Sequence, residues 1–159
     1  MKKCSDKTNV MRILDQHKIF YNTYDYSNTL AISGLDVCNV LNQNSNQVFK
    51  TLVTIGASKK YYVFLVPVSN ELNLKKAAKS VGEKNIEMIK SKDLLSLTGY
   101  VHGGCSPIGM KKQFITTIDS SSLNFETIIF SAGKIGYQVE VNLNELKKVI
   151  DYKLEDIIN

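Results

Sequence analysis

The sequence lacks the features that mark membrane, secreted and metal-binding proteins. Its longest apolar run, Tyr61 to Val68, falls far short of the roughly 20 residues that cross a bilayer. The polar segment Met1 to Asn9 contains no apolar core of a signal peptide. The cysteines Cys4, Cys38 and Cys105 are odd in number, suit a reducing compartment and show no zinc-type spacing. We therefore expect a soluble cytoplasmic protein with no metal and no cofactor.

Arginine is also scarce, since Arg12 is the only one in the chain. Lysine plus arginine number 20 against 15 aspartates and glutamates, which gives a net charge of +5. This excess favours a polyanionic partner, although a solubility role explains it equally well. Because lysine supplies point charges, such a partner would be held through its phosphates and not through bidentate contacts to bases.

The length of 159 residues and the ordinary globular composition predict a single domain spanning residues 1–159. Apolar periodicity predicts helices at 10–17 (capped by Asp6 or Thr8), from Ser33 or Asp36 to 41, at 71–81, at 91–97 (capped by Ser91) and from Asn142 onward. Alternation predicts strands at 19–26, 47–55, 60–68, 86–89, 114–118, 127–131 and 137–141. Since turns alone join several neighbouring strands, we expect an α+β fold with mixed or antiparallel pairing.

Lys50 interrupts the otherwise apolar strand 48–53. Alternation places Lys50 on one face of this strand and Thr51 on the other. A lysine in the middle of a sheet is desolvated at a cost unless an anion meets it. The alternative is a lysine on an edge strand whose ammonium reaches water.

The segment Gly99 to Gly109 holds four of the nine glycines and one of the two prolines. The consecutive pair Gly103 and Gly104 can turn several backbone N–H groups toward one point, as in an oxyanion or phosphate cradle. The segment matches neither the P-loop nor the dinucleotide-binding pattern. Taken alone, it is also explained as a turn between two elements.

Cys105 follows the glycine pair and suggests a nucleophile, with His102 or His17 as its base. No asparagine or aspartate is placed to complete a triad, so a small residue filling a turn is favoured. A second glycine-flanked turn, Ser131 to Gly136, carries Lys134. By itself that turn is an ordinary hairpin with a surface charge.

Four segments together, in this order, resemble the YbaK family of aminoacyl-tRNA deacylases, relatives of the editing insertion of bacterial prolyl-tRNA synthetase. They are Phe49 to Val53, Leu74 to Lys79, Gly99 to Gly109 and Ser131 to Gly136, and the likeness runs from about Thr8 to Ile157. The resemblance implies a mixed β-sheet partly rolled into a barrel with helices around it. It also implies that the chain clears cysteine from mischarged tRNA(Pro), with prolyl-tRNA synthetase as a partner.

Carried onto this sequence, the resemblance places catalytic roles on Lys50, Gly103 and Gly104. The substrate-binding positions that it implies are Tyr24, Thr51, Cys105, Ser106, Pro107, Ser131, Gly133 and Lys134. The chain departs from its relatives in having Ser33-Gly34 where a Phe-Gly pair often starts the second helix. It also has Lys134-Ile135-Gly136 in place of Lys-Arg-Gly, with one cation fewer.

The resemblance implies that the thiol of the substrate attacks its own ester carbonyl. A free cysteine thiol has a pKa near 8.5, and intramolecular attack avoids much of the entropy cost. On this hypothesis the Gly103-Gly104 backbone stabilises negative charge, Lys50 holds the terminal adenosine, and Cys105 is a bystander.

Two alternatives stay open at this point. The first is a deacylase for another small amino acid such as alanine, because one atom changes binding by only about 1–3 kcal/mol. The second is a non-catalytic module that binds tRNA or a synthetase, which would not need the lysine and the glycine pair. A panel of differently charged tRNAs distinguishes these possibilities.

Overall fold

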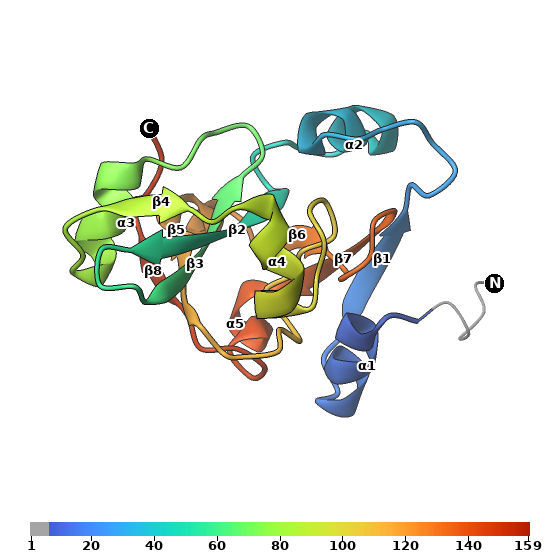
Figure 1. The fold of residues 1–159 in the computed structure, drawn as a ribbon. Coiled ribbons are helices and arrows are strands. Elements are labelled where there is room, and N and C mark those ends of the chain that lie inside the picture. The colour runs from blue at the N-terminus through green and yellow to red at the C-terminus, as the bar shows by residue number, and fades with distance from the viewer. Residues whose placement is uncertain (1–6) are drawn as a thin grey trace.

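The structure is a computed structural model that describes residues 7–159 (Figure 1). The helices are α1 (Asn9–Gln16), α2 (Gly34–Leu41), α3 (Leu74–Val81), α4 (Ser91–Thr98), η2 (Ser120–Asn124, 3-10) and α5 (Leu143–Leu146). The strands are β1 (Tyr21–Asp25), β2 (Phe49–Gly56), β3 (Tyr61–Pro67), β4 (Ile86–Met88), β5 (Ile115–Asp119), β6 (Thr127–Ser131), β7 (Tyr137–Asn142) and β8 (Lys153–Glu155). Figure 1 shows α3 and the C-terminus at one end of the molecule, and α1, α2 and β1 at the other.

The strands form two sheets, one of three strands in the order β1-β7-β6 and one of five in the order β4-β2-β3-β5-β8. The three-stranded sheet is antiparallel, whereas β3 pairs with β5 and β5 with β8 in parallel. The α+β class and the mixed pairing are therefore confirmed.

The predicted partial barrel is wrong, because the strands form two separate sheets and neither sheet closes on itself. A single parallel bridge between Val48 and Ile129 joins the start of β2 to β6. β4 is only three residues long and pairs with the far end of β2. No ladder continues along β2 between these two contacts in the part of the chain that the structure describes, so the sheets stay separate.

Most helix ends follow from local side-chain chemistry. Thr8 caps α1 by accepting the N–H of Met11, while Asp6 lies outside the described residues. Ser33 and Asp36 form a capping box at the start of α2, in which each side chain accepts the other residue's backbone N–H.

Gly82 ends α3 in the left-handed conformation, as its position after the apolar pattern predicts. The predicted cap at Ser91 is wrong: Ser91 is the first helical residue of α4, and Lys90 precedes it without a side-chain cap. Asn142 caps α5, which lasts only four residues. None of the helices in residues 7–159 is long and apolar enough to span a membrane.

The five-stranded sheet separates two apolar clusters. Phe49 and Val53 enter the larger cluster, which also contains the inner face of the three-stranded sheet. Leu52 packs against the smaller cluster beneath α3. Since side chains alternate along β2, Lys50 lies on the α3 side and Thr51 on the side of the main core.

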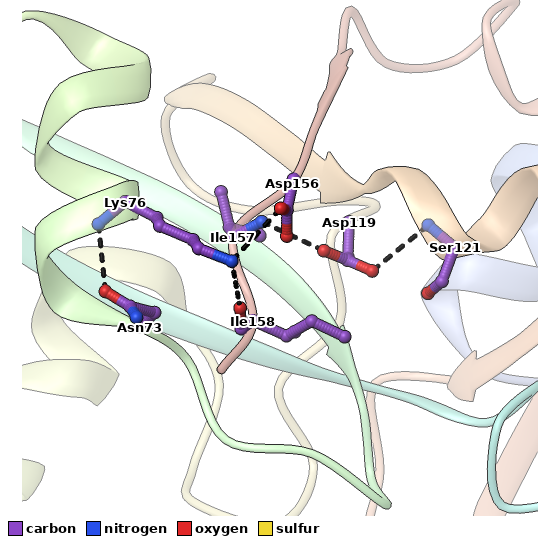
Figure 2. Close-up of polar contacts among 7 residues, drawn as sticks. All are labelled: Asn73, Lys76, Asp119, Ser121, Asp156, Ile157 and Ile158. Carbon is purple, nitrogen blue, oxygen red and sulfur yellow. Dashed lines mark hydrogen bonds and ion pairs between the residues drawn. The ribbon is translucent and has the colours of Figure 1, made fainter.

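A buried carboxylate fastens the C-terminal segment (Figure 2). Asp119, only 2% exposed, accepts the N–H groups of Ile157 and Ser121, each at 3.0 Å. Lys76 of α3 donates to the Asp156 carboxylate at 3.0 Å and to the Ile158 carbonyl at 2.8 Å. The last residues are therefore held to β5 and to α3.

Candidate active site

A cavity of about 510 Å³ lies beside the first half of β2. Its walls come from β2, the start of α2, the segment from the end of β4 into α4, the glycine-rich loop, and one residue each of β6 and β7. This volume is within the range of roughly 300–1,000 Å³ that small-molecule sites occupy.

The cavity exists because one edge of β2 has no partner there. Val48 is bridged to β6, and β4 pairs with Thr54 and the residues after it. Within residues 7–159, no strand lies against that edge of β2 between these points. The main chain around Thr51 therefore faces the cavity.

Lys50 lies on this open stretch of β2 and lines the cavity. Its ammonium is 3.5 Å from Oε2 of Glu71, and the two side chains are 30% and 80% exposed. An ion pair as exposed as this one contributes little to stability. The ammonium can therefore exchange Glu71 for an anionic group of a ligand at small cost.

The glycine-rich loop meets the second glycine-flanked turn. Gly103 lines the cavity with φ of +90°, a conformation that residues with a Cβ rarely adopt. A Cβ on Gly104 would be 3.1 Å from the backbone nitrogen of Ile135, so any other residue would push the neighbouring turn away. Ser131 and Gln138 pair across β6 and β7, and both line the cavity. The structure thus joins two segments that lie about 30 residues apart.

Cys105 lines the cavity but is only 8% exposed. Burial raises the pKa of its thiol to about 12, and this effect outweighs a hydrogen bond with Thr98. At neutral pH the thiol is therefore protonated, and a protonated thiol is a poor nucleophile.

Of the residues singled out in the sequence, the cavity lining includes Lys50, Thr51, Gly103, Cys105 and Ser131. It does not include Tyr24, Gly104, Ser106, Pro107, Gly133 and Lys134. The Tyr24 hydroxyl donates to Glu140, whose carboxylate raises the pKa of Tyr24 to about 12. The Lys134 ammonium lies 5.2 Å from the ring centroid of Tyr137. The Tyr24 ring packs against the apolar cluster that contains Val48, a residue of the wall.

Sequence reasoning did not assign several polar side chains of the wall to the site, among them Tyr26 and Gln138. Gln138 is 6% exposed, and its amide oxygen accepts from Gln43 at 2.8 Å. A glutamine in the apolar strand β7 was the available indication, because buried amides in strands need partners. Tyr26 gave no such indication, since it stands among several aromatic residues.

No described residue of the lining is an aspartate or a glutamate. Among residues 7–159, Lys50 and His102 are the lining residues that can carry a positive charge. The described residues also contain no group of three or more His, Cys, Asp or Glu side chains able to hold a metal ion. The wall consists of hydroxyls, amides, backbone groups and apolar side chains, with one ammonium. Such a wall suits a compact, mostly neutral ligand that carries one anionic group.

The fold and this cavity define a small domain with a ligand-sized cavity at the open edge of a β-strand. The model of the aminoacyl-tRNA editing domain matches residues 33–149. The chain belongs to this family, which makes it a deacylase by class, as the sequence motifs predict.

Relatives and solved structures agree with this membership. A protein of Enterococcus faecalis (strain ATCC 700802 / V583), named "Putative Cys-tRNA(Pro)/Cys-tRNA(Cys) deacylase EbsC", is 45% identical over 141 residues, 88% of this chain and 86% of that protein. Proline--tRNA ligase of Nitrosomonas eutropha (strain DSM 101675 / C91 / Nm57) is 29% identical over 104 residues, 65% of this chain but 18% of the ligase. A crystal structure described as "a putative trans-editing enzyme for prolyl tRNA synthetase" superposes with a TM-score of 0.79 at 20% identity, covering 100% of this chain and 99% of that one.

Proposed function

We propose that the chain hydrolyses the ester bond of Cys-tRNA(Pro) and that the thiol of the substrate is the nucleophile. The observation that carries this proposal is a cavity that joins Lys50 to Gly103 while the thiol in its wall, Cys105, is held neutral. The 45% identical relative bears the name of a Cys-tRNA(Pro)/Cys-tRNA(Cys) deacylase, which supports this substrate.

The step needs no nucleophile from the protein. The thiolate sulfur of the substrate bonds to its ester carbonyl carbon, and the C–O bond to the ribose breaks. The thiol proton goes to the leaving ribose oxygen, so tRNA departs with a free hydroxyl. Water then opens the cyclic thioester to free cysteine. The protein has to orient the ester and stabilise the negative charge that develops on its carbonyl oxygen.

The glycine-rich loop and Lys50 divide these tasks. The backbone N–H of Gly103 stabilises the oxyanion, because glycine lets it approach without a side chain. The N–H of Gly104 is already engaged, since it donates to the Val101 carbonyl at 3.0 Å. Lys50 binds a phosphate oxygen of the terminal adenosine or the carbonyl oxygen of the ester that this adenosine bears, a role that requires charge and no proton transfer. Glu71 holds this ammonium until the substrate arrives. Cytoplasmic aminoacyl-tRNA is the substrate, and prolyl-tRNA synthetase is the partner that would deliver it.

The test uses purified protein and tRNA(Pro) charged with cysteine, alanine or proline. We expect loss of cysteine alone, and Lys50→Ala to slow it about 10- to 100-fold, as for a lost charge-assisted hydrogen bond. Lys148→Ala is the matched control, because Lys148 forms a similar exposed pair with Glu145 at 2.9 Å and does not line the cavity. Preferred loss of alanine would reassign the substrate. If the protein binds tRNA with steep salt dependence yet leaves every ester intact, it is a binding module.

A further inference from the structure

We propose that Thr51 holds the α-amino group of the aminoacyl ester, through its backbone carbonyl and its hydroxyl. This inference rests on the proposed function and adds to it the residue that recognises the substrate as an amino acid.

The main chain of Thr51 faces the cavity. In an antiparallel pair, every second residue of a strand bonds to its neighbour. Val48 and Gly56 bond to the β3 side, so the even-numbered residues of β2 face β3 and the odd-numbered residues face the other edge. Thr51 therefore directs its N–H and C=O to the opposite edge. On that edge the carbonyl of Val53 accepts the N–H of Ile89, and the bridge at Val48 is the next contact in the other direction. The stretch at Thr51 has no strand partner within residues 7–159.

The hydroxyl of Thr51 is also without a partner. Its Oγ1 is buried, and no atom of the described residues hydrogen-bonds to it. The next threonine on the strand, Thr54, differs, since its hydroxyl donates to the Tyr62 carbonyl at 2.9 Å. Buried hydroxyls without partners are uncommon, and at a cavity wall a ligand is the natural partner.

An α-amino group needs acceptors, and the cavity offers few. No carboxylate of the described residues lines it, so only neutral oxygens are available. Lys50 does not repel the amino group, because its ammonium lies toward Glu71, on the other face of β2. Thr51 presents two acceptors, its carbonyl and its hydroxyl oxygen. They bind the amine or the ammonium, which gives a partner to two of the three groups that Thr51 leaves without one, its carbonyl and its hydroxyl.

The test compares two substrates and two variants. The substrates are cysteinyl-tRNA and 3-mercaptopropionyl-tRNA, which keeps the thiol and ester but lacks the amino group. Thr51→Val removes the hydroxyl at nearly constant volume. The matched control is Thr117→Val, because the Thr117 hydroxyl is equally buried and unpartnered but does not line the cavity. Each rate is divided by that of spontaneous hydrolysis of the same ester.

We expect Thr51→Val to lower kcat/KM for cysteinyl-tRNA about 10- to 100-fold and to leave the 3-mercaptopropionyl rate unchanged. Thr117→Val should change neither rate, and Thr51→Ser should retain most of the activity. Equal losses on the two substrates would show a structural role and overturn the inference, as would a Thr51→Val rate within twofold of wild type. If Thr51→Val does not fold, the wild type alone provides the test. Equal normalised rates on cysteinyl-tRNA and 3-mercaptopropionyl-tRNA would then overturn the role proposed for Thr51. A wild type inert on both substrates refutes the proposed function instead.

Discussion

Replacing Cys105 by alanine removes the one thiol of the described residues that lines the cavity. With a pKa of about 12, Cys105 is ionised to only about 3 × 10⁻⁵ at pH 7.5, whereas a substrate thiol of pKa near 8.5 is ionised to about 0.1. The substrate thiol therefore has roughly a 3,000-fold advantage in thiolate population. We expect Cys105→Ala to retain single-turnover hydrolysis of Cys-tRNA(Pro) within about twofold, measured as release of labelled cysteine.

We expect Cys105→Ala to reduce the stability of the fold. Loss of one buried sulfur lowers the free energy of unfolding by about 1–2 kcal/mol, a shift of about 2–8 °C in Tm for a chain of this size. Cys38→Ala is the matched control, since Cys38 is also buried, also has a raised pKa, and does not line the cavity. The reasoning is refuted if Cys105→Ala loses more than 100-fold in hydrolysis rate while Cys38→Ala does not, and the two variants melt at the same temperature. Cys105 would then be the nucleophile.

The same thiol predicts a pH dependence of stability. Burial raises the pKa of Cys105 from 9.0 to about 12, so the folded state favours the protonated thiol. The stability that the folded state gains from keeping this thiol protonated is fully present below pH 9 and is lost as the pH rises toward 12. Urea denaturation from pH 8 to 11 should show a smaller decline for Cys105→Ala than for wild type, and parallel declines would contradict the buried, neutral thiol.

Three further predictions concern the supporting structure. Asp119→Ala leaves the N–H of Ile157 without a partner and should lower the free energy of unfolding by about 2–4 kcal/mol in urea titrations. A loss below about 0.5 kcal/mol would contradict the anchoring role. Gly104→Ala places a Cβ 3.1 Å from a backbone nitrogen and should cost about 1–3 kcal/mol with reduced deacylation, whereas unchanged activity would separate the loop from the chemistry. The bond to Glu140 raises the pKa of Tyr24 to about 12, so the wild type should lose stability as the pH rises from 10 to about 12. Tyr24→Phe should not show this part of the loss. A titration at 295 nm that finds Tyr24 ionising near pH 10 would refute the contact.

Local patterns predicted most of the fold. The hairpin of β2 and β3 and the caps at Thr8 and Ser33 each depend on neighbours a few residues away. The cap at Ser91 failed because a serine beside a lysine does not show which of the two opens the helix. The short strand β8 and its parallel pairing with β5 escaped prediction, since they depend on the Asp119 anchor more than 30 residues away.

The candidate site was predicted in part. The motifs selected Lys50, Thr51 and Gly103, which the structure brings to one cavity. The sequence could not show that β2 has an unpaired edge at this point, because the gap results from where the backbone contacts of β2 with β4 and with β6 end. It could not distinguish Tyr24, which bonds to Glu140 and does not line the cavity, from Tyr26, which does line it.

The most direct test compares single-turnover hydrolysis of Cys-tRNA(Pro) and Ser-tRNA(Pro) by the wild-type protein. The two substrates differ by one atom, sulfur against oxygen, and fill nearly the same volume. If the substrate thiol is the nucleophile, cysteine is released and serine persists, with rates at least about 100-fold apart, because a serine hydroxyl is scarcely ionised at neutral pH. Comparable rates for the two esters would show that water or a protein group attacks the carbonyl, and would contradict the account.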